Sequence, residues 1–131
     1  MTRIPVVDDK AYVRNWIREF LAIQPDWQVC GEAENGLQAV EQAARLQPHV
    51  ILLDIYMPEM NGFDAAQLIL KASPHILILM VSLHKDRQFS EAAKECGAKG
   101  LVLKSDAATT LLPAISTVLR GELHFPVVPL N

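Results

Sequence analysis

The chain has 131 residues, of which 50% are hydrophobic and 21% are charged, and its formal net charge is −3. This length fits a single domain, and the apolar content excludes a disordered chain. The slightly acidic balance argues against direct binding of nucleic acid by this domain.

Neither export nor membrane insertion is predicted. Cys30 and Cys96 are far apart and form no CxxC unit, which indicates free thiols in a reducing cytoplasm. The N-terminus lacks a signal-peptide pattern, because acidic residues begin at Asp8. The longest apolar runs are far too short to cross a bilayer. We therefore expect a cytoplasmic protein without a membrane partner.

Five short apolar runs alternate with helical patterns along the chain. In order, the sequence predicts a strand over residues 4–7, a helix over 11–21, a strand over 27–33, a helix over 37–46, a strand over 50–53, a helix over 63–71, a strand over 76–81, a helix over 88–96, a strand over 100–103 and a helix over 111–119. Gly97 and Gly121 are well placed to end the last two helices.

This alternation defines the expected fold class. Apolar strands separated by helices are typical of a parallel sheet that is covered on both faces. Right-handed crossovers then give a doubly wound α/β domain. We assign residues 1–123 to this single domain. Residues 124–131 carry two prolines and no periodicity, so we expect a linker or a frayed end there.

Two prolines predict local irregularities in this fold. Pro5 lies inside the first strand, where it removes a backbone donor from the sheet. Pro113 lies inside the last helix, where it would remove a hydrogen bond to residue 109 and bend the helix.

Polar residues stand where the apolar runs end. They follow the first, third, fourth and fifth predicted strands, and they are Asp8, Asp9, Asp54, Ser82 and Lys104. Because ligands of open α/β sheets bind at the carboxyl edge of the strands, we expect these side chains to form one cluster.

The residue types in this cluster indicate phosphoryl chemistry with a divalent cation. Three carboxylates in one crevice repel each other unless a cation relieves the repulsion. Hard oxygen ligands without His or Cys favour Mg²⁺ over zinc. Mg²⁺, a lysine and a hydroxyl together suit a phosphoryl group, whose transfer needs charge neutralisation and positioning. Asp54 is the natural nucleophile, while Asp8 and Asp9 serve the metal.

The order of the motifs resembles the receiver domains of two-component response regulators, over about residues 1 to 123. The motifs that carry the resemblance are Val6-Val7-Asp8-Asp9, Leu52-Leu53-Asp54-Ile55-Tyr56-Met57-Pro58, Met60-Asn61-Gly62, Val81-Ser82, Cys96-Gly97-Ala98-Lys99-Gly100 and Leu103-Lys104. The resemblance implies a flavodoxin-like fold with the strand order 2-1-3-4-5 and a non-enzymatic signalling switch. It also implies a sensor histidine kinase as the donor of the phosphoryl group, and possible homodimerisation.

The resemblance also implies a role for each site residue. Asp54 would be the phosphoacceptor, and Asp9 and Asp54 would ligate Mg²⁺ directly. The main-chain carbonyl of Tyr56 would be the third protein ligand, and Asp8 would act through water. Ser82 would be the switch hydroxyl, and Lys104 would pair with the phosphoryl oxygens.

The sequence departs from the family pattern at two positions. Leu101 stands where the family often has an aromatic switch residue, so we expect coupling to depend more on residues 82–87. Ser105 replaces the usual proline after the lysine. With the ending Leu119-Arg120-Gly121-Glu122, this resembles the subfamily with a helix-turn-helix output domain. Transcription would then be regulated through a DNA-binding domain absent from these 131 residues. The alternative is a stand-alone receiver that acts by protein contact, although we favour the fragment.

Two other classes share parts of this pattern. A different α/β phosphatase that forms an aspartyl phosphate would use a DxD motif, whereas Asp8 and Asp9 are adjacent. A flavodoxin-like FMN carrier would need a glycine- and hydroxyl-rich loop after the first strand, where Asp8 and Asp9 would repel a phosphate. Phosphoryl uptake from acetyl phosphate, or a yellow purified protein, would discriminate between these classes.

Overall fold

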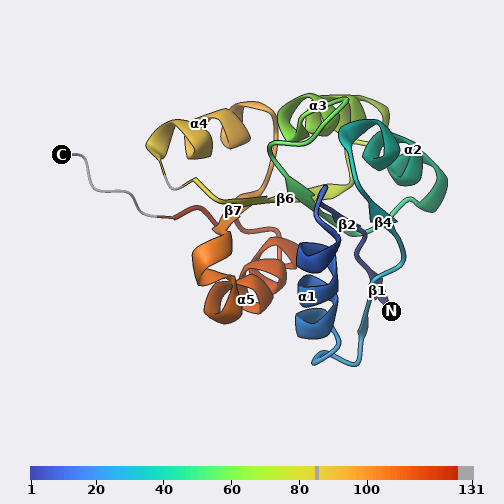
Figure 1. Ribbon diagram of the computed structural model, residues 1–131, viewed down its shortest axis with the longest axis vertical. Helices are drawn as coiled ribbons and strands as arrows, with labels where there is room; N and C mark the ends of the chain where they lie inside the picture. The colour runs from blue at the N-terminus through green and yellow to red at the C-terminus, as the bar shows by residue number, and fades with distance from the viewer. Residues whose placement is uncertain (85, 127–131) are drawn as a thin grey trace.

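A five-stranded parallel sheet runs through the centre of the computed structural model, which describes residues 1–84 and 86–126 (Figure 1). The strands lie in the order β4-β2-β5-β6-β7. Their bounds are Val6–Val7 for β2, Glu32–Ala33 for β4, Val50–Asp54 for β5, Leu77–Ser82 for β6 and Gly100–Leu103 for β7. In terms of the five predicted strands this order is 2-1-3-4-5, so the predicted topology is confirmed.

Helices cover both faces of the sheet. Figure 1 shows α1 and α5 on one face and α2, α3 and α4 on the other. Their bounds are Ala11–Leu21 for α1, Gly36–Leu46 for α2, Gly62–Ala72 for α3, Arg87–Glu95 for α4 and Ala107–Leu119 for α5. A short 3₁₀ helix, η1 (Lys104–Asp106), precedes α5. All five predicted helices are present, and α5 begins earlier than predicted.

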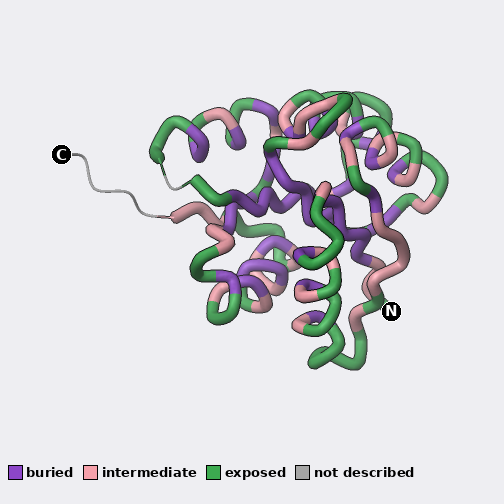
Figure 2. Tube along the Cα trace, in the orientation of Figure 1, coloured by how far each residue is buried: buried purple, intermediate pink, exposed green. Residues whose placement is uncertain are grey.

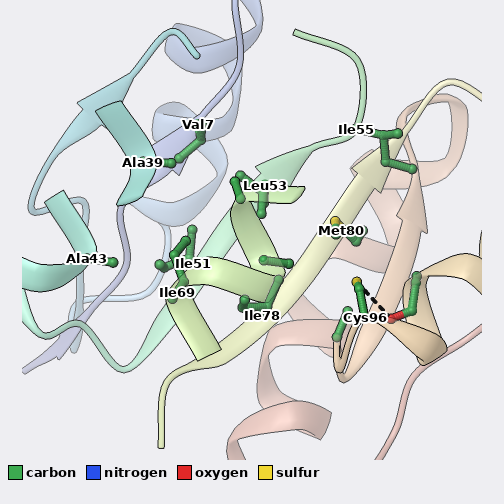
Figure 3. Close-up of a cluster of buried hydrophobic side chains, with 14 of the residues drawn as sticks. Val7, Ala39, Ala43, Ile51, Leu53, Ile55, Ile69, Ile78, Met80 and Cys96 are labelled. Carbon is green, nitrogen blue, oxygen red and sulfur yellow. Dashed lines mark hydrogen bonds between the residues drawn. The ribbon is translucent and has the colours of Figure 1, made fainter. Parts of the chain in front are cut away.

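The core consists of two apolar layers, one on each side of the sheet. All five residues of β5 are buried, and Figure 2 shows the central strands as the most continuously buried part of the chain. Ile51 and Leu53 pack in the layer beneath α2, α3 and α4, part of which Figure 3 shows. Val50 and Leu52 pack in the layer beneath α1 and α5. The unbroken apolar run of β5 is therefore explained by burial on both faces.

The first predicted strand, over 4–7, is shortened to β2, and the second, over 27–33, is divided into two pieces. Short strands β1 (Thr2–Arg3) and β3 (Trp27–Gln28) pair with each other, separately from the main sheet. Two residues separate β1 from β2, but three separate β3 from β4, so the second segment carries one extra residue. Pro5 lies at this break, and its carbonyl accepts a hydrogen bond from the Leu52 N–H (3.1 Å). The predicted irregularity at Pro5 is confirmed, whereas the single strand over 27–33 was wrong because a bulge faces the proline.

Pro113 does not interrupt the last helix. α5 runs from Ala107 to Leu119 through this residue. The Thr117 hydroxyl donates a hydrogen bond to the Pro113 carbonyl (2.9 Å). The predicted bend at Pro113 stays a prediction.

The chain beyond α5 returns to the edge of the sheet. The His124 N–H donates to the Lys99 carbonyl (3.0 Å), and the Leu101 N–H donates to the His124 carbonyl (2.8 Å). Gly100 permits this approach, because a Cβ there would lie 2.6 Å from the His124 oxygen. Of the segment expected to be a linker or frayed end, residues 127–131 lie outside the described part.

Two further expectations concern the cysteines and the membrane. Both cysteines are free; Cys96 is buried, whereas Cys30 is only half-buried. Within the described ranges, the helices are too short and insufficiently apolar to traverse a bilayer.

Candidate functional site

Three carboxylates meet at the carboxyl edge of the sheet. Asp8 and Asp9 follow β2, and Asp54 is the last residue of β5. One carboxylate oxygen from each lies within 4.8 Å of the others. Asp8 and Asp54 are only 1% and 6% exposed, so most of this negative charge is removed from water. Such a set of oxygen ligands could hold a divalent cation.

Strand pairing explains why these residues meet. β2 and β5 are neighbours, with Val7 opposite Leu53, so Asp8 and Asp54 follow at the same level. A close turn then carries the chain from Asp54 to α3. Gly62 is required in this turn, because a Cβ there would lie 2.1 Å from the Asp54 carbonyl oxygen.

Lys104 supplies a positive charge to this edge. It follows β7, and its side chain is only 9% exposed. The ammonium lies 2.7 Å from Asp8 Oδ2 and 3.3 Å from Asp54 Oδ1. It therefore bridges two buried carboxylates that come from different strands. A buried ammonium in this position offsets part of their repulsion and could pair with an incoming anion.

The surroundings of Asp54 raise the pKa of its carboxyl group above the ordinary value. Burial raises its pKa, and the neighbouring Asp8 carboxylate raises it further. The Lys104 ammonium and the Ile55 N–H act in the opposite direction, and the pKa settles at about 6. The Ile55 N–H donates to Asp54 Oδ1 at 2.9 Å. This hydrogen bond and the Lys104 contact both involve Oδ1.

Ser82 and Tyr56 lie on the wall of the same site. A cavity of about 150 Å³ beside Asp54 is lined by Ser82, Tyr56 and Lys104, among others. The Ser82 hydroxyl accepts a hydrogen bond from the His84 N–H (2.9 Å) and donates one to the His84 carbonyl (3.1 Å). The structure thus brings together all six residues that the sequence singled out.

Arg14 is a supporting residue that the sequence analysis missed. Its guanidinium donates to the Asp8 carbonyl (2.6 Å) and to the Glu32 carboxylate (3.0 Å), and so fixes the loop after β2. The sequence contains no signal for this role, because Arg14 has an ordinary position on α1.

An aromatic cluster beside the site was also missed. The His84 ring stacks on Phe89 at a centroid distance of 4.8 Å, and the Tyr56 ring meets both edge-on. Phe89 belongs to α4 and packs into the core. This cluster, Tyr56–His84–Phe89, connects the wall of the site to α4. Three chain segments contribute to it, so local sequence patterns do not reveal it.

Together the sheet and its edge define a parallel α/β domain with an acidic, lysine-bridged site. Residues 4–116 match the response regulator receiver domain family, and the chain belongs to that family. The chain is 34% identical over 123 residues to the transcriptional regulatory protein YdfI of Bacillus subtilis (strain 168). The aligned region covers 94% of this chain and 57% of YdfI.

Solved structures of this family share the fold. A two-component response regulator of the LuxR family from Aurantimonas sp. SI85-9A1 has a TM-score of 0.91 and 30% identity, over 95% of this chain and 89% of that chain. The response regulator domain of Thermotoga maritima CheB has a TM-score of 0.85 and 34% identity, over 98% of this chain and 99% of that domain. This chain spans about half the length of the curated relatives it matches.

Proposed function

We propose that Asp54 takes a phosphoryl group from a sensor histidine kinase and that the chain acts as a signalling switch. The observation that carries this proposal is the buried Asp54, held between the Asp8 carboxylate and the Lys104 ammonium at the edge of the sheet. Buried charges of this kind contribute little to the stability of the fold, because their removal from water costs free energy. We propose a switch and not an enzyme, since the phosphoryl group stays on the chain until it is hydrolysed.

The donor set fits Mg²⁺. Oxygens of Asp8, Asp9 and Asp54 lie within 4.8 Å of one another, and Mg²⁺ prefers oxygen ligands. Asp9 and Asp54 would bind it directly with the Tyr56 main-chain carbonyl, and Asp8 would act through water. A bound Mg²⁺ would neutralise the negative charge that an incoming phosphoryl group adds.

The remaining chemistry falls to the side chains of this chain. Asp54 Oδ2 attacks phosphorus, and the bond from phosphorus to the donor's leaving group breaks. Lys104 exchanges its contact with Asp54 for a phosphoryl oxygen, which gives a charge-assisted hydrogen bond. The transfer to Asp54 needs a carboxylate, so it should slow below pH 6, where Asp54 is protonated.

Ser82 would convert phosphorylation into movement. Its hydroxyl now bonds the His84 backbone in both directions. Turning toward a phosphoryl oxygen would release His84, whose ring stacks on Phe89 of α4. Leu101 is a buried aliphatic residue on β7 and offers no aromatic ring for this purpose. We therefore propose that the signal leaves the site through α4.

The wider function is also a proposal. Relatives such as YdfI are transcriptional regulators, so we propose that this domain controls transcription through a DNA-binding output domain outside these 131 residues. Residues 1–123 would form the receiver, and residues 124–131 would begin the linker. Phosphorylation would change self-association, with a homodimer as one form. The cytoplasmic location stays a prediction.

Incubation with acetyl phosphate and Mg²⁺, followed by intact-mass measurement, tests the central proposal. We expect the gain of one phosphoryl group, and complete loss of that gain in Asp54→Asn. Asp26→Asn is the matched control, since Asp26 is exposed and far from the site in sequence. Full labelling of Asp54→Asn at another residue would contradict the assignment.

A further inference from the structure

A second and larger cavity adjoins the Asp54 site. Its volume is about 460 Å³, within the range of roughly 300–1,000 Å³ that is common for small-molecule sites. Its lining residues are Lys10, Tyr12, Val13, Trp16, Leu83 and Lys104. Three of them, Lys10, Leu83 and Lys104, also line the smaller cavity that contains Asp54. The two cavities are therefore neighbours with a shared boundary.

The larger cavity combines apolar walls with a cationic boundary. Tyr12 and Leu83 are 70% and 69% exposed, although both are large and hydrophobic. Trp16 is braced by an edge-on contact with Phe20, at a centroid distance of 4.9 Å. The two lysines stand where the cavities meet. Exposed apolar side chains that gather around a cavity are typical of a binding site, whereas exposed apolar side chains scattered singly over a surface are common and need no explanation.

We propose that this cavity binds the organic leaving group of a small acyl phosphate, and that it favours donors with a flat apolar acyl group. The inference rests on the proposed phosphorylation of Asp54 and names the class of small-molecule donor. The phosphoryl end of such a donor is anionic and fits beside Lys104 and Lys10. Its acyl group is apolar and fits between the rings of Tyr12 and Trp16. The cationic boundary thus suits the phosphoryl end of the donor, and the apolar walls of the larger cavity suit its acyl end.

The reaction balances without any further reactant. Asp54 Oδ2 forms the new bond to phosphorus, and the bond between phosphorus and the acyl oxygen breaks. The acyl group departs as a carboxylate with the bonding electron pair, and no proton moves. The leaving carboxylate is released next to Lys10, whose ammonium lies 3.4 Å from Asp9 Oδ1 before the reaction.

Comparison of benzoyl phosphate with acetyl phosphate tests this inference. The quantity measured is the ratio of the two initial phosphorylation rates, followed by intact mass in excess Mg²⁺. The double variant Tyr12→Ala/Leu83→Ala should lower this ratio about tenfold, because it removes the apolar surface that the phenyl ring would cover. A general loss of phosphorylation cancels in the ratio. Leu68→Ala is the matched control, since Leu68 is an exposed leucine on α3, and it should leave the ratio unchanged.

The outcomes separate the two proposals. If Asp54 is labelled by both donors and the ratio in the double variant stays within about twofold of wild type, the leaving-group site is wrong and the phosphoacceptor stands. If neither donor labels Asp54, the proposed function itself fails.

Direct binding provides an independent readout. Benzylphosphonate cannot transfer its phosphoryl group, so it can be titrated at equilibrium with Mg²⁺ present. In a Trp27→Phe background, Trp16 is the remaining tryptophan, and its fluorescence should report binding. Benzylphosphonate should bind about tenfold more tightly than methylphosphonate. Equal affinities, or a fluorescence change that survives Tyr12→Ala/Leu83→Ala at the same midpoint, would overturn the inference.

Discussion

The cluster of Asp8, Asp54 and Lys104 and the start of α4 are built in contrasting ways. All three residues stand at strand ends of the buried sheet, and the Lys104 ammonium contacts both carboxylates. α4 begins after the loop that follows Ser82, and its Asp86 N-cap position lacks a side-chain capping hydrogen bond in the described chain. By contrast, α2 and α3 begin with Asn35 and Asn61, each of which caps its helix.

Under the proposed function, this contrast separates the residues that take part in phosphoryl transfer from the segment that passes the signal on. A helix N-cap is worth about 1 kcal/mol, so the first turn of α4 is held less firmly than those of α2 and α3. Residues that must meet a phosphoryl group within hydrogen-bonding distance benefit from rigid strands. A segment that must change its position benefits from contacts that are easily exchanged. The two hydrogen bonds between Ser82 and His84 are of this second kind.

The buried charge of the cluster should appear as a stability penalty, which is the largest effect we expect. Asp54 has a pKa of about 6 in the folded chain and 3.8 as its ordinary value. Between these values the folded state binds more protons than the unfolded state, so the free energy of unfolding falls as the pH rises from about 4 to 6. Asp54→Asn should therefore be more stable than wild type at pH 7.5, by about 2–3 kcal/mol without Mg²⁺.

Urea unfolding at a series of pH values checks this prediction. The stability difference between Asp54→Asn and wild type should shrink as the pH falls and vanish at about pH 3 and below, where the carboxyl is protonated in both states. Asp26→Asn, at an exposed position, serves as the control. Saturating Mg²⁺ should remove the penalty in wild type. A wild-type protein that is more stable than Asp54→Asn at pH 7.5 without Mg²⁺ would show that the cluster stabilises the fold.

Metal binding should distinguish the two carboxylates after β2. Asp9→Ala removes a proposed direct ligand and should weaken Mg²⁺ binding by about 10–100-fold. Asp8→Ala should weaken it less, since the proposed link is through water. Calorimetric titration with Mg²⁺ measures both affinities. Equal affinity of wild type and Asp9→Ala would exclude Asp9 as a ligand.

The sequence was most informative where a residue's position depends on a strand end. Asp54 and Lys104 were located because apolar runs end beside them, and parallel strands bring their carboxyl ends to one edge. The break opposite Pro5 was harder to foresee, because the bulge lies in the partner segment around residues 29–31. The Arg14 contact and the return of His124 to the sheet depend on tertiary packing alone. Such contacts leave no periodic trace in the sequence.

The smallest predicted effect concerns the route from the site to α4, and it tests the contrast directly. Binding of beryllofluoride to Asp54 mimics the phosphoryl group and should draw the Ser82 hydroxyl away from His84. Loss of one or two modest hydrogen bonds beside a weakly held helix start should lower the local opening free energy by about 1 kcal/mol. Amide hydrogen exchange in the first turn of α4 should then become about fivefold faster, while the capped start of α2 stays unchanged.

Two serine variants make this prediction specific. Ser82→Ala removes the bonds to His84 in the free protein, so its α4 should exchange faster without beryllofluoride and respond little when it binds. Ser73→Ala removes another buried serine hydroxyl, at the end of α3, and should behave like wild type. Because the His84 ring stacks on Phe89, Phe89→Leu should also weaken the response of α4. If exchange changes only in the loops that line the Asp54 cavity and peptides covering α4 stay the same, the signal leaves the site by another path.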